Sequence, residues 1–176
     1  MKKGIKIAIS GKSGCGNTTV SKIIAERLGL EFINFTFRSL ALEKGITLSD
    51  VLAFAAQDDS WDKEVDMRQV RLARESGGCV LGSRLSVWML EEADLKVYLT
   101  ASAEIRAARI ERREGETLEA AAAFTAERDR QDRERYIRIY KIDNNNYGFV
   151  NMVINTDNLN PDTIARMIIA EAEKIC

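Results

Sequence analysis

The stretch Gly11-Lys12-Ser13-Gly14-Cys15-Gly16-Asn17-Thr18-Thr19 decides the fold of this chain. It has the spacing of a phosphate-binding loop, G-x-x-x-x-G-K-[ST]. In such loops backbone N–H groups and the start of the next helix cradle phosphate, a lysine reaches the outer phosphates, and a hydroxyl binds Mg²⁺. Asn17 stands where that lysine belongs. The alternative is an ordinary turn between a strand and a helix, because glycine-rich turns are common.

The segments on either side favour phosphate binding. Residues 5–10 form a short, β-branched and nearly unbroken apolar run, which is typical of a buried parallel strand. Residues 18–28 then follow a helical pattern that ends at Gly29. Strand, loop and helix in this order are the context that the motif requires. We therefore expect the phosphates of a nucleotide to be bound by Gly11, Ser13, Gly14, Cys15, Gly16, Asn17, Thr18 and Thr19.

The composition fits one domain with an ordinary apolar core. The chain has 176 residues, of which 45% are hydrophobic, and its 26 basic and 27 acidic residues leave a net charge of -1. That balance suggests neither a nucleic acid nor a membrane surface as partner. No signal-like segment begins the chain and no run approaches about 18 apolar residues, so we expect a cytoplasmic protein.

Histidine is absent from the chain, which excludes Ser-His and Cys-His nucleophilic chemistry and histidine metal cages. Cys15, Cys79 and Cys176 lie far apart in the sequence, which favours neither a disulfide framework nor a zinc site. Cys15 fits a small space-filling residue better than a nucleophile. Catalysis would have to use positioning, arginine, carboxylate and a metal ion.

Strand and helix patterns alternate along the rest of the chain. We expect two or three helices within residues 37–75, with Thr47 as an N-cap, and a last helix that begins at Pro161 after Asn160 as its cap. Such alternation predicts a parallel sheet whose ligand site lies at the carboxyl ends of the strands. The further strands are expected at residues 30–35, 79–82, 95–99 and 151–155.

Arginine is the sole kind of basic residue from Arg106 to Arg138. This stretch reads as two helices, one opened by residues 102–104 and one over residues 117–140. A solvated face with i,i+4 ion pairs would explain the mixed charges. The planar fork of arginine nevertheless suits phosphate oxygens better than lysine does. We favour a phosphate-handling lid, because a phosphate-binding loop is already present.

Taken together, the loop and five downstream segments resemble the nucleoside monophosphate kinases, most closely the cytidylate kinases of the compact archaeal type and their bacterial relatives. The resemblance covers almost the whole chain. Its segments are Phe37-Arg38-Ser39-Leu40-Ala41, Trp61-Asp62-Lys63-Glu64-Val65-Asp66-Met67-Arg68-Gln69, Leu81-Gly82-Ser83-Arg84-Leu85, Arg128-x-x-x-Asp132-x-x-Arg135-Tyr136, and Val153-Ile154-Asn155-Thr156.

The resemblance implies an α/β, three-layer P-loop kinase fold with a five-stranded parallel sheet. The single domain, residues 1–176, would carry a helical monophosphate-binding segment at 36–76 and a short Arg-rich lid at 109–135. The implied activity is the ATP- and Mg²⁺-dependent phosphorylation of a nucleoside monophosphate, most closely CMP or dCMP, by a monomer. Two alternatives stay open: a P-loop kinase for another nucleotide or a small metabolite, and a non-catalytic nucleotide-binding sensor.

Individual roles on the acceptor side follow from the resemblance. Arg38 is similar to the arginine that holds the acceptor phosphate, and Arg84 to one that contacts the acceptor nucleotide. Asp132 and Arg135 match positions that read the sugar and the cytosine edge. Asp62 and Asp66 could approach the acceptor base or could cap and solvate a helix.

The resemblance also implies roles on the ATP side. Arg109 and Arg113 resemble a pair in which one guanidinium stacks on adenine and the other meets phosphate. Asn155 and Thr156 would flank the adenine, and Thr18 would be the Mg²⁺ ligand.

Three residue features depart from the family pattern. No acidic residues flank Ser83 and Arg84, and Phe35 occupies a position that is often small or polar. Asn17 brings no charge, so another cation must serve the outer phosphates. We predict that this cation is Lys12, the second residue of the loop, or a lid arginine, Arg128 or Arg133. The alternative is that Lys12 points to solvent.

Overall fold

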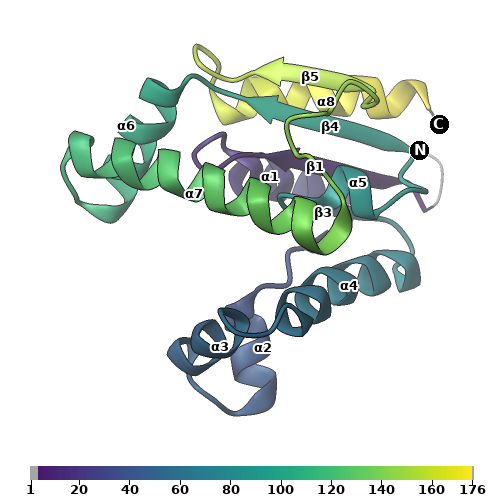
Figure 1. Cartoon of the computed structure of the whole chain (residues 1–176). Helices are drawn as coiled ribbons and strands as arrows, with labels where there is room; N and C mark the ends of the chain where they lie inside the picture. The colour runs from purple at the N-terminus through teal and green to yellow at the C-terminus, as the bar shows by residue number, and fades with distance from the viewer. Residues whose placement is uncertain (1–3, 176) are drawn as a thin grey trace.

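The computed structural model describes residues 4–175. Within them the strands form a five-stranded parallel sheet with the order β2-β3-β1-β4-β5 (Figure 1). The α/β fold class, the parallel sheet and all five expected strands are therefore confirmed. The strands are β1 (Lys6–Gly11), β2 (Glu31–Ile33), β3 (Cys79–Gly82), β4 (Leu95–Thr100) and β5 (Met152–Asn155).

Helices α1 (Asn17–Leu28) and α8 (Pro161–Lys174) pack together on one face of the sheet, behind it in Figure 1. The main core lies there, because the alternate β1 residues Ile7 and Ile9 join side chains from both helices. Ala8, between them, belongs to a cluster on the opposite face. That cluster includes residues of α5 (Ser86–Met89) and of the segment that follows α7.

Three helices form an arm that projects from the β2 side of the sheet (Figure 1). They are α2 (Phe37–Lys44), α3 (Leu48–Ala55) and α4 (Ser60–Glu75). We call them the helical arm. It has a small core of its own, built from Leu40, Ala41, Val51 and Val65. Thr47 caps α3 with a reciprocal capping box, as expected.

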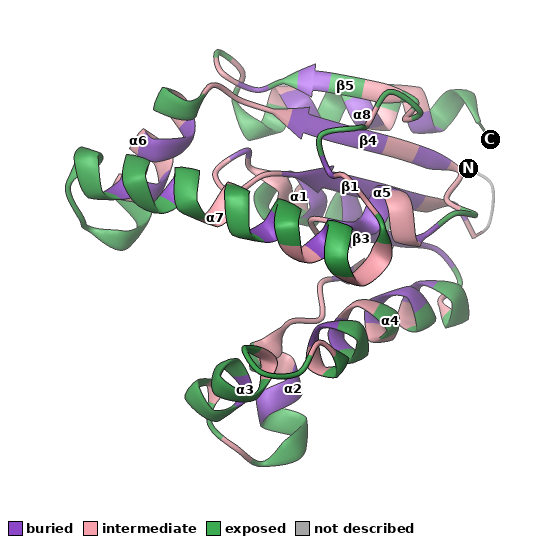
Figure 2. Cartoon of the chain, in the orientation of Figure 1, coloured by how far each residue is buried: buried purple, intermediate pink, exposed green. Residues whose placement is uncertain are grey.

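Two further helices form the second projecting element, seen on the left of Figure 1. They are α6 (Ala103–Glu114) and α7 (Leu118–Tyr140), which pack on each other through Ala107, Ile110 and Ala121. Ser102 and Thr117 cap their first turns. Figure 2 shows the resulting pattern on α7, where buried positions recur along one side and the other positions are intermediate or exposed.

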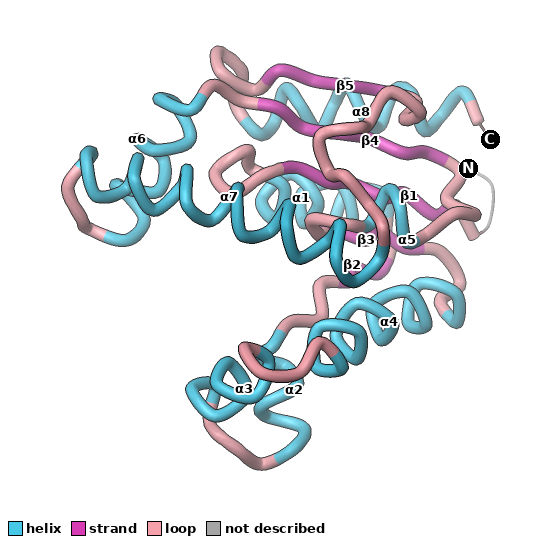
Figure 3. The backbone as a smooth tube through the Cα atoms, viewed as in Figure 1, coloured by secondary structure: helices cyan, strands magenta, loops and turns pink. Residues whose placement is uncertain are grey.

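The short helix α5 was not expected from the sequence (Figure 3). Its four residues are too few to show a helical period. The Ser86 hydroxyl donates to the carbonyl of Ile9 at 2.7 Å, and the Ser10 hydroxyl accepts from the Val87 N–H at 3.1 Å, so tertiary contacts with β1 hold the helix.

The two tryptophans pack in different parts of the molecule. Trp88 contacts the ring of Tyr98 edge-on, at a centroid distance of 5.8 Å, and so belongs to the sheet. Trp61 stacks on Phe54 within the helical arm, at 5.2 Å. Among the described residues, no helix is both long and apolar enough to cross a membrane.

Candidate active site

A cleft of about 770 Å³ lies at the carboxyl ends of the strands. The glycine-rich loop and the start of α1 form one wall, and α4 with the start of α2 forms another. Residues 82–85, at the end of β3 and just after it, the start of α8, and side chains of α6 and α7 complete it. Of the residues expected to act, those that line the cleft are Gly11, Lys12, Ser13, Gly14, Cys15, Gly16, Asn17, Thr18, Thr19, Arg84, Arg109, Arg113, Arg128 and Arg135.

The loop has the backbone of a tight anion cradle. Gly14 and Gly16 have φ angles of 84° and 91°, in the left-handed region that side chains disfavour. A Cβ atom on Gly14 would also lie 2.9 Å from Arg106. The Cys15 side chain is buried beneath the loop, and this burial raises the pKa of its thiol, as expected for a space-filling residue. Thr18 and Thr19 are exposed on the first turn of α1.

Asn17 faces protein groups at both ends of its amide. Its Nδ2 donates to the carbonyl of Ser83 at 3.1 Å, and its Oδ1 accepts from the Ser21 hydroxyl at 3.1 Å. The amide thus joins the end of the loop to the residues after β3. It stands in the position of the usual lysine but holds the loop rather than supplying a charge.

Two arginines of α6 hold the loop from the other side. Arg106 donates to the carbonyl of Ser13 at 3.2 Å, and Arg109 donates to that of Gly14 at 3.1 Å. Arg109 also donates to the hydroxyl and the carbonyl of Thr156, at 2.9 and 2.6 Å. Thr156 is fully buried, so it positions Arg109 from beneath the site instead of lining the cleft.

Asp129 of α7 connects the lid to the loop. Its carboxylate accepts two hydrogen bonds from Arg106, at 2.7 and 3.2 Å, while Lys12 Nζ lies 3.9 Å from it. Sequence reasoning missed Arg106 and Asp129. The spacing of Arg106 three residues before Arg109 was an available signal, because that spacing places both on one helix face.

Opposite charges alternate along the acceptor side of the cleft. Arg84 donates to the Ser13 hydroxyl at 3.0 Å and lies 3.2 Å from a carboxylate oxygen of Asp132. Arg135 lies between Asp132, at 2.8 Å, and Asp62, at 3.1 Å. The two aspartate side chains are each 8% exposed, so these ion pairs are partly protected from solvent. Arg84 and Arg135 are consequently fixed in position.

Asp66 and Gln69 of α4 reach the cleft one helical turn apart. Asp66 accepts a hydrogen bond of 2.7 Å from the Tyr140 hydroxyl. Burial raises the pKa of Asp66 to about 6, although this hydrogen bond acts in the opposite direction. The sequence left the role of Asp66 open and gave no sign that Tyr140 would face it from α7.

The structure does not bring every expected side chain to the cleft. Arg133 forms two hydrogen bonds with Asp143, at 2.9 and 2.7 Å, and is about half exposed. Arg38 and Asn155 are exposed and are not among the residues that line the cleft. Arg128, in contrast, packs over the Phe124 ring and lines the cleft. Burial and the nearby Arg84 guanidinium lower the pKa of Arg128.

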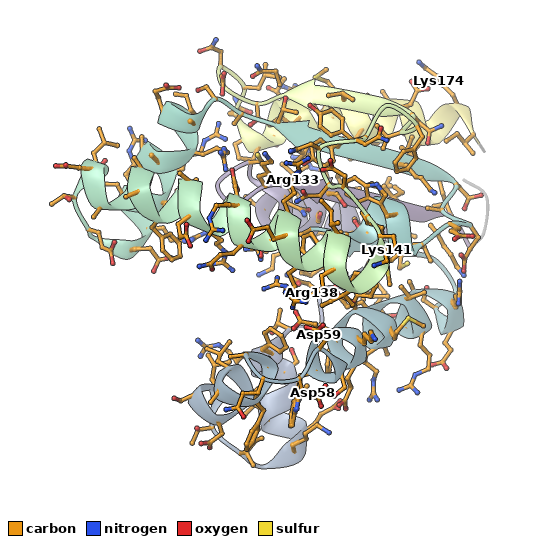
Figure 4. All side chains as sticks on the ribbon, viewed as in Figure 1. Asp58, Asp59, Arg133, Arg138, Lys141 and Lys174 are labelled. Atoms are coloured by element: carbon orange, nitrogen blue, oxygen red, sulfur yellow. The ribbon has the colours of Figure 1, made fainter. Side chains whose placement is uncertain are left out.

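The helical arm and α7 also meet outside the cleft. Figure 4 shows Arg138 of α7 pointing toward Asp59, which immediately precedes α4. The two hydrogen bonds between them measure 2.6 and 3.2 Å, and the side chains of Arg138 and Asp59 are 61% and 35% exposed. The arm and α7 are therefore bridged both at the cleft, through Asp62 and Asp66, and at its outer edge.

The residues present fit a magnesium ion that is bound together with nucleotide phosphates. Within residues 4–175 no group of three or more His, Cys, Asp or Glu side chains could hold a metal ion. Thr18 offers a hydroxyl beside the loop, and Mg²⁺ commonly takes one or two protein ligands with phosphates and water. Thr18 therefore fits as a ligand of a phosphate-bound ion.

Comparisons with known proteins point to one family. The model of the cytidylate kinase-like family matches residues 6–158. Cytidylate kinase 2 of Borreliella burgdorferi is 44% identical over 174 residues, which are 97% of this chain and 96% of that protein. The cytidylate kinase of Pyrococcus horikoshii is 38% identical over 176 residues, with coverage of 99% and 91%.

Solved structures show the same fold at lower identity. Shikimate kinase from Acinetobacter baumannii in complex with shikimate has a TM-score of 0.66 and 17% identity, with coverage of 97% of this chain and 94% of that one. Deoxyadenosine kinase from M. mycoides with bound dATP has a TM-score of 0.61 and 19% identity, with coverage of 96% and 100%. At such identities the likeness concerns the fold alone.

Proposed function

The chain belongs to the cytidylate kinase-like family, and from that premise we propose that it is a nucleoside monophosphate kinase that phosphorylates CMP or dCMP with ATP. One observation carries the proposal: the loop shares its cleft with Arg84 and Arg135, and the buried Asp132, outside the lining, holds both guanidinium groups in place. A protein that only bound ATP would not need this acceptor-side set.

The reaction joins an acceptor phosphate oxygen to the terminal phosphorus of ATP and breaks the bond to ADP. Its catalyst must hold two polyanions in line, neutralise charge and exclude water. The loop N–H groups would bind the donor phosphates, and Mg²⁺ on Thr18 would neutralise part of their charge. Arg84 would contact the acceptor nucleotide, while Asp132 and Arg135 would contact its sugar and base.

Lys12 and Arg128 are proposed to supply the charge that Asn17 lacks. Asp129 is already paired with Arg106 through two hydrogen bonds, so the 3.9 Å contact of Lys12 leaves this lysine able to move onto phosphate. Arg128 lies in the cleft with its guanidinium over an aromatic ring. Arg133 is not part of this set, because its guanidinium is held by Asp143.

Two groups would complete the site on closure. Arg38, at the start of α2, would reach the acceptor phosphate when the helical arm moves toward the loop, as lids do when water must be excluded. Arg113, near the end of α6 and 61% exposed, would meet the donor nucleotide in the same way. Arg109 and Asn155 would flank its adenine.

A coupled assay of ADP release with CMP, dCMP, UMP, AMP and GMP tests the proposal. We expect turnover with CMP or dCMP that exceeds turnover with each of the others. Greater turnover with another acceptor would show that this acceptor, and not CMP or dCMP, is the substrate. Binding of ATP without ADP release from any acceptor would instead identify a nucleotide sensor.

A further inference from the structure

Two hydrogen-bond acceptors of α4, on Asp66 and Gln69, lie side by side in the cleft and have few donors near them. Gln69 is 5% exposed, and its Oε1 is buried without a hydrogen-bond partner within the described structure. Its Nε2 lies 3.5 Å from Asp66 Oδ1, at the limit of a hydrogen bond, while Asp66 Oδ2 accepts a hydrogen bond from the Tyr140 hydroxyl. A buried polar atom without a partner is costly, so a donor from a ligand would be favoured there.

We propose that Asp66 and Gln69 form the subsite that reads the base of the acceptor nucleotide, and that this subsite selects an amino group over a carbonyl at pyrimidine position 4. The proposal rests on the proposed function, because it assumes that a nucleotide occupies the acceptor side. It adds a role in base selection for α4 to the contacts that Asp132 and Arg135 of α7 would make with the sugar and base. Residues 82–85, after β3, offer no carboxylate for this task.

The donor pattern of cytosine matches the pair. Its exocyclic amino group carries two N–H donors, one for Asp66 Oδ1 and one for Gln69 Oε1. Uracil presents a carbonyl oxygen at that position, which would face the Asp66 carboxylate. The Gln69 amide could donate to this carbonyl only by turning its own oxygen toward the same carboxylate. Sites that hydrogen-bond a substrate group reject analogues that lack it far more strongly than apolar pockets do. We expect CMP to be preferred over UMP by on the order of 100-fold.

The protonation of Asp66 gives the preference a dependence on pH. Its burial and the neighbouring Asp62 carboxylate raise its pKa, whereas Tyr140, Arg135 and Arg84 lower it, and the result is about 6. Above this pH the carboxylate only accepts hydrogen bonds and favours the amino group. Below it the protonated carboxyl can donate to the carbonyl of uracil, so the preference for CMP should fall as the pH drops through about 6.

The test compares CMP and UMP in the parent, Asp66→Asn, Gln69→Leu and Asp59→Asn proteins. The ratio of kcat/KM values and the ratio of Kd values are both measured from about pH 5 to about pH 8, a range that extends on both sides of the pKa of Asp66, which is about 6. Asp59→Asn is the matched control, because it weakens another contact between the helical arm and α7 without touching the cleft.

We expect Asp66→Asn and Gln69→Leu to reduce the CMP preference at least about 10-fold, while Asp59→Asn leaves it unchanged. Asp66→Asn should also make the preference for CMP over UMP independent of pH. In Tyr140→Phe the pKa of Asp66 rises, because a hydrogen bond to the carboxylate is lost, so the midpoint should move to higher pH.

Ratios within twofold of the control for both cleft variants, or a parent ratio that does not change with pH, would overturn the inference. Thermal melting of each variant shows whether it is folded, and a variant that fails to fold is replaced by Asp66→Glu or Gln69→Glu. Absence of turnover in the parent protein would overturn the proposed function, but the Kd ratios would still decide the role of the subsite.

Discussion

The amide of Asn17 is hydrogen-bonded to Ser83 and Ser21 and carries no charge, so the cation for the outer phosphates has to come from another residue. We expect Lys12→Ala to lower kcat about 100-fold or more, and Arg128→Ala to act similarly, because each would remove a positive charge from the transferring phosphoryl group. Lys174→Ala, on an exposed lysine of α8, is the control. Turnover of Lys12→Ala within a few-fold of the parent would show that Lys12 has no such role.

Sequence reasoning identified the loop and most cleft arginines, because their residue types and spacing carry the chemistry. It could not place Arg133, whose partner Asp143 lies beyond the end of α7, nor Gln69, whose unpartnered oxygen is visible only in three dimensions. In both cases the outcome depends on which neighbour a side chain meets, which helical spacing does not specify.

At the scale of elements, the Arg106–Asp129 ion pair joins α6 to α7, and Arg106 also holds the loop by donating to the carbonyl of Ser13. Arg106 is 8% exposed at its side chain, so its removal would leave Asp129 partly buried and without its main partner. We expect Arg106→Ala to lower the free energy of unfolding by about 3 kcal/mol in urea titrations.

Arg138→Ala offers the comparison, since its ion pair with Asp59 is exposed and should contribute less than about 1 kcal/mol. Equal losses of unfolding free energy in the two variants would contradict the prediction that the buried ion pair of Arg106 contributes more than the exposed one of Arg138.

The helix boundaries of this region were predictable because Ser102 and Thr117 are strong caps. The short helix α5 was not, since only contacts with β1 stabilise it.

At the scale of the whole molecule, the alternation of strands and helices was sufficient to predict the parallel sheet. Buried parallel strands are continuous apolar runs, as residues 5–10 show, and helices must connect them. The approach of the helical arm to α7 was not predictable, because it depends on contacts such as Tyr140 with Asp66, which join residues 74 positions apart.

A metal chelator should separate function from folding. We expect EDTA to abolish turnover, because the proposed reaction needs Mg²⁺ on the phosphates. It should shift the melting temperature of the nucleotide-free protein by no more than about 1 °C, since no carboxylate cluster able to hold a metal was found within residues 4–175. Added Mg²⁺ should restore turnover. A fall of several degrees with EDTA alone would reveal a structural metal.

Because of the placement of the two tryptophans, intrinsic fluorescence can report on the helical arm and on the sheet separately. Trp61 stacks on Phe54 in the helical arm, whereas Trp88 packs on Tyr98 against the sheet. Each indole therefore emits from a different part of the molecule. With Trp88 replaced by Phe, the remaining tryptophan fluorescence would come from the arm alone, and stopped-flow mixing with nucleotides would time the movement of the arm without any attached dye.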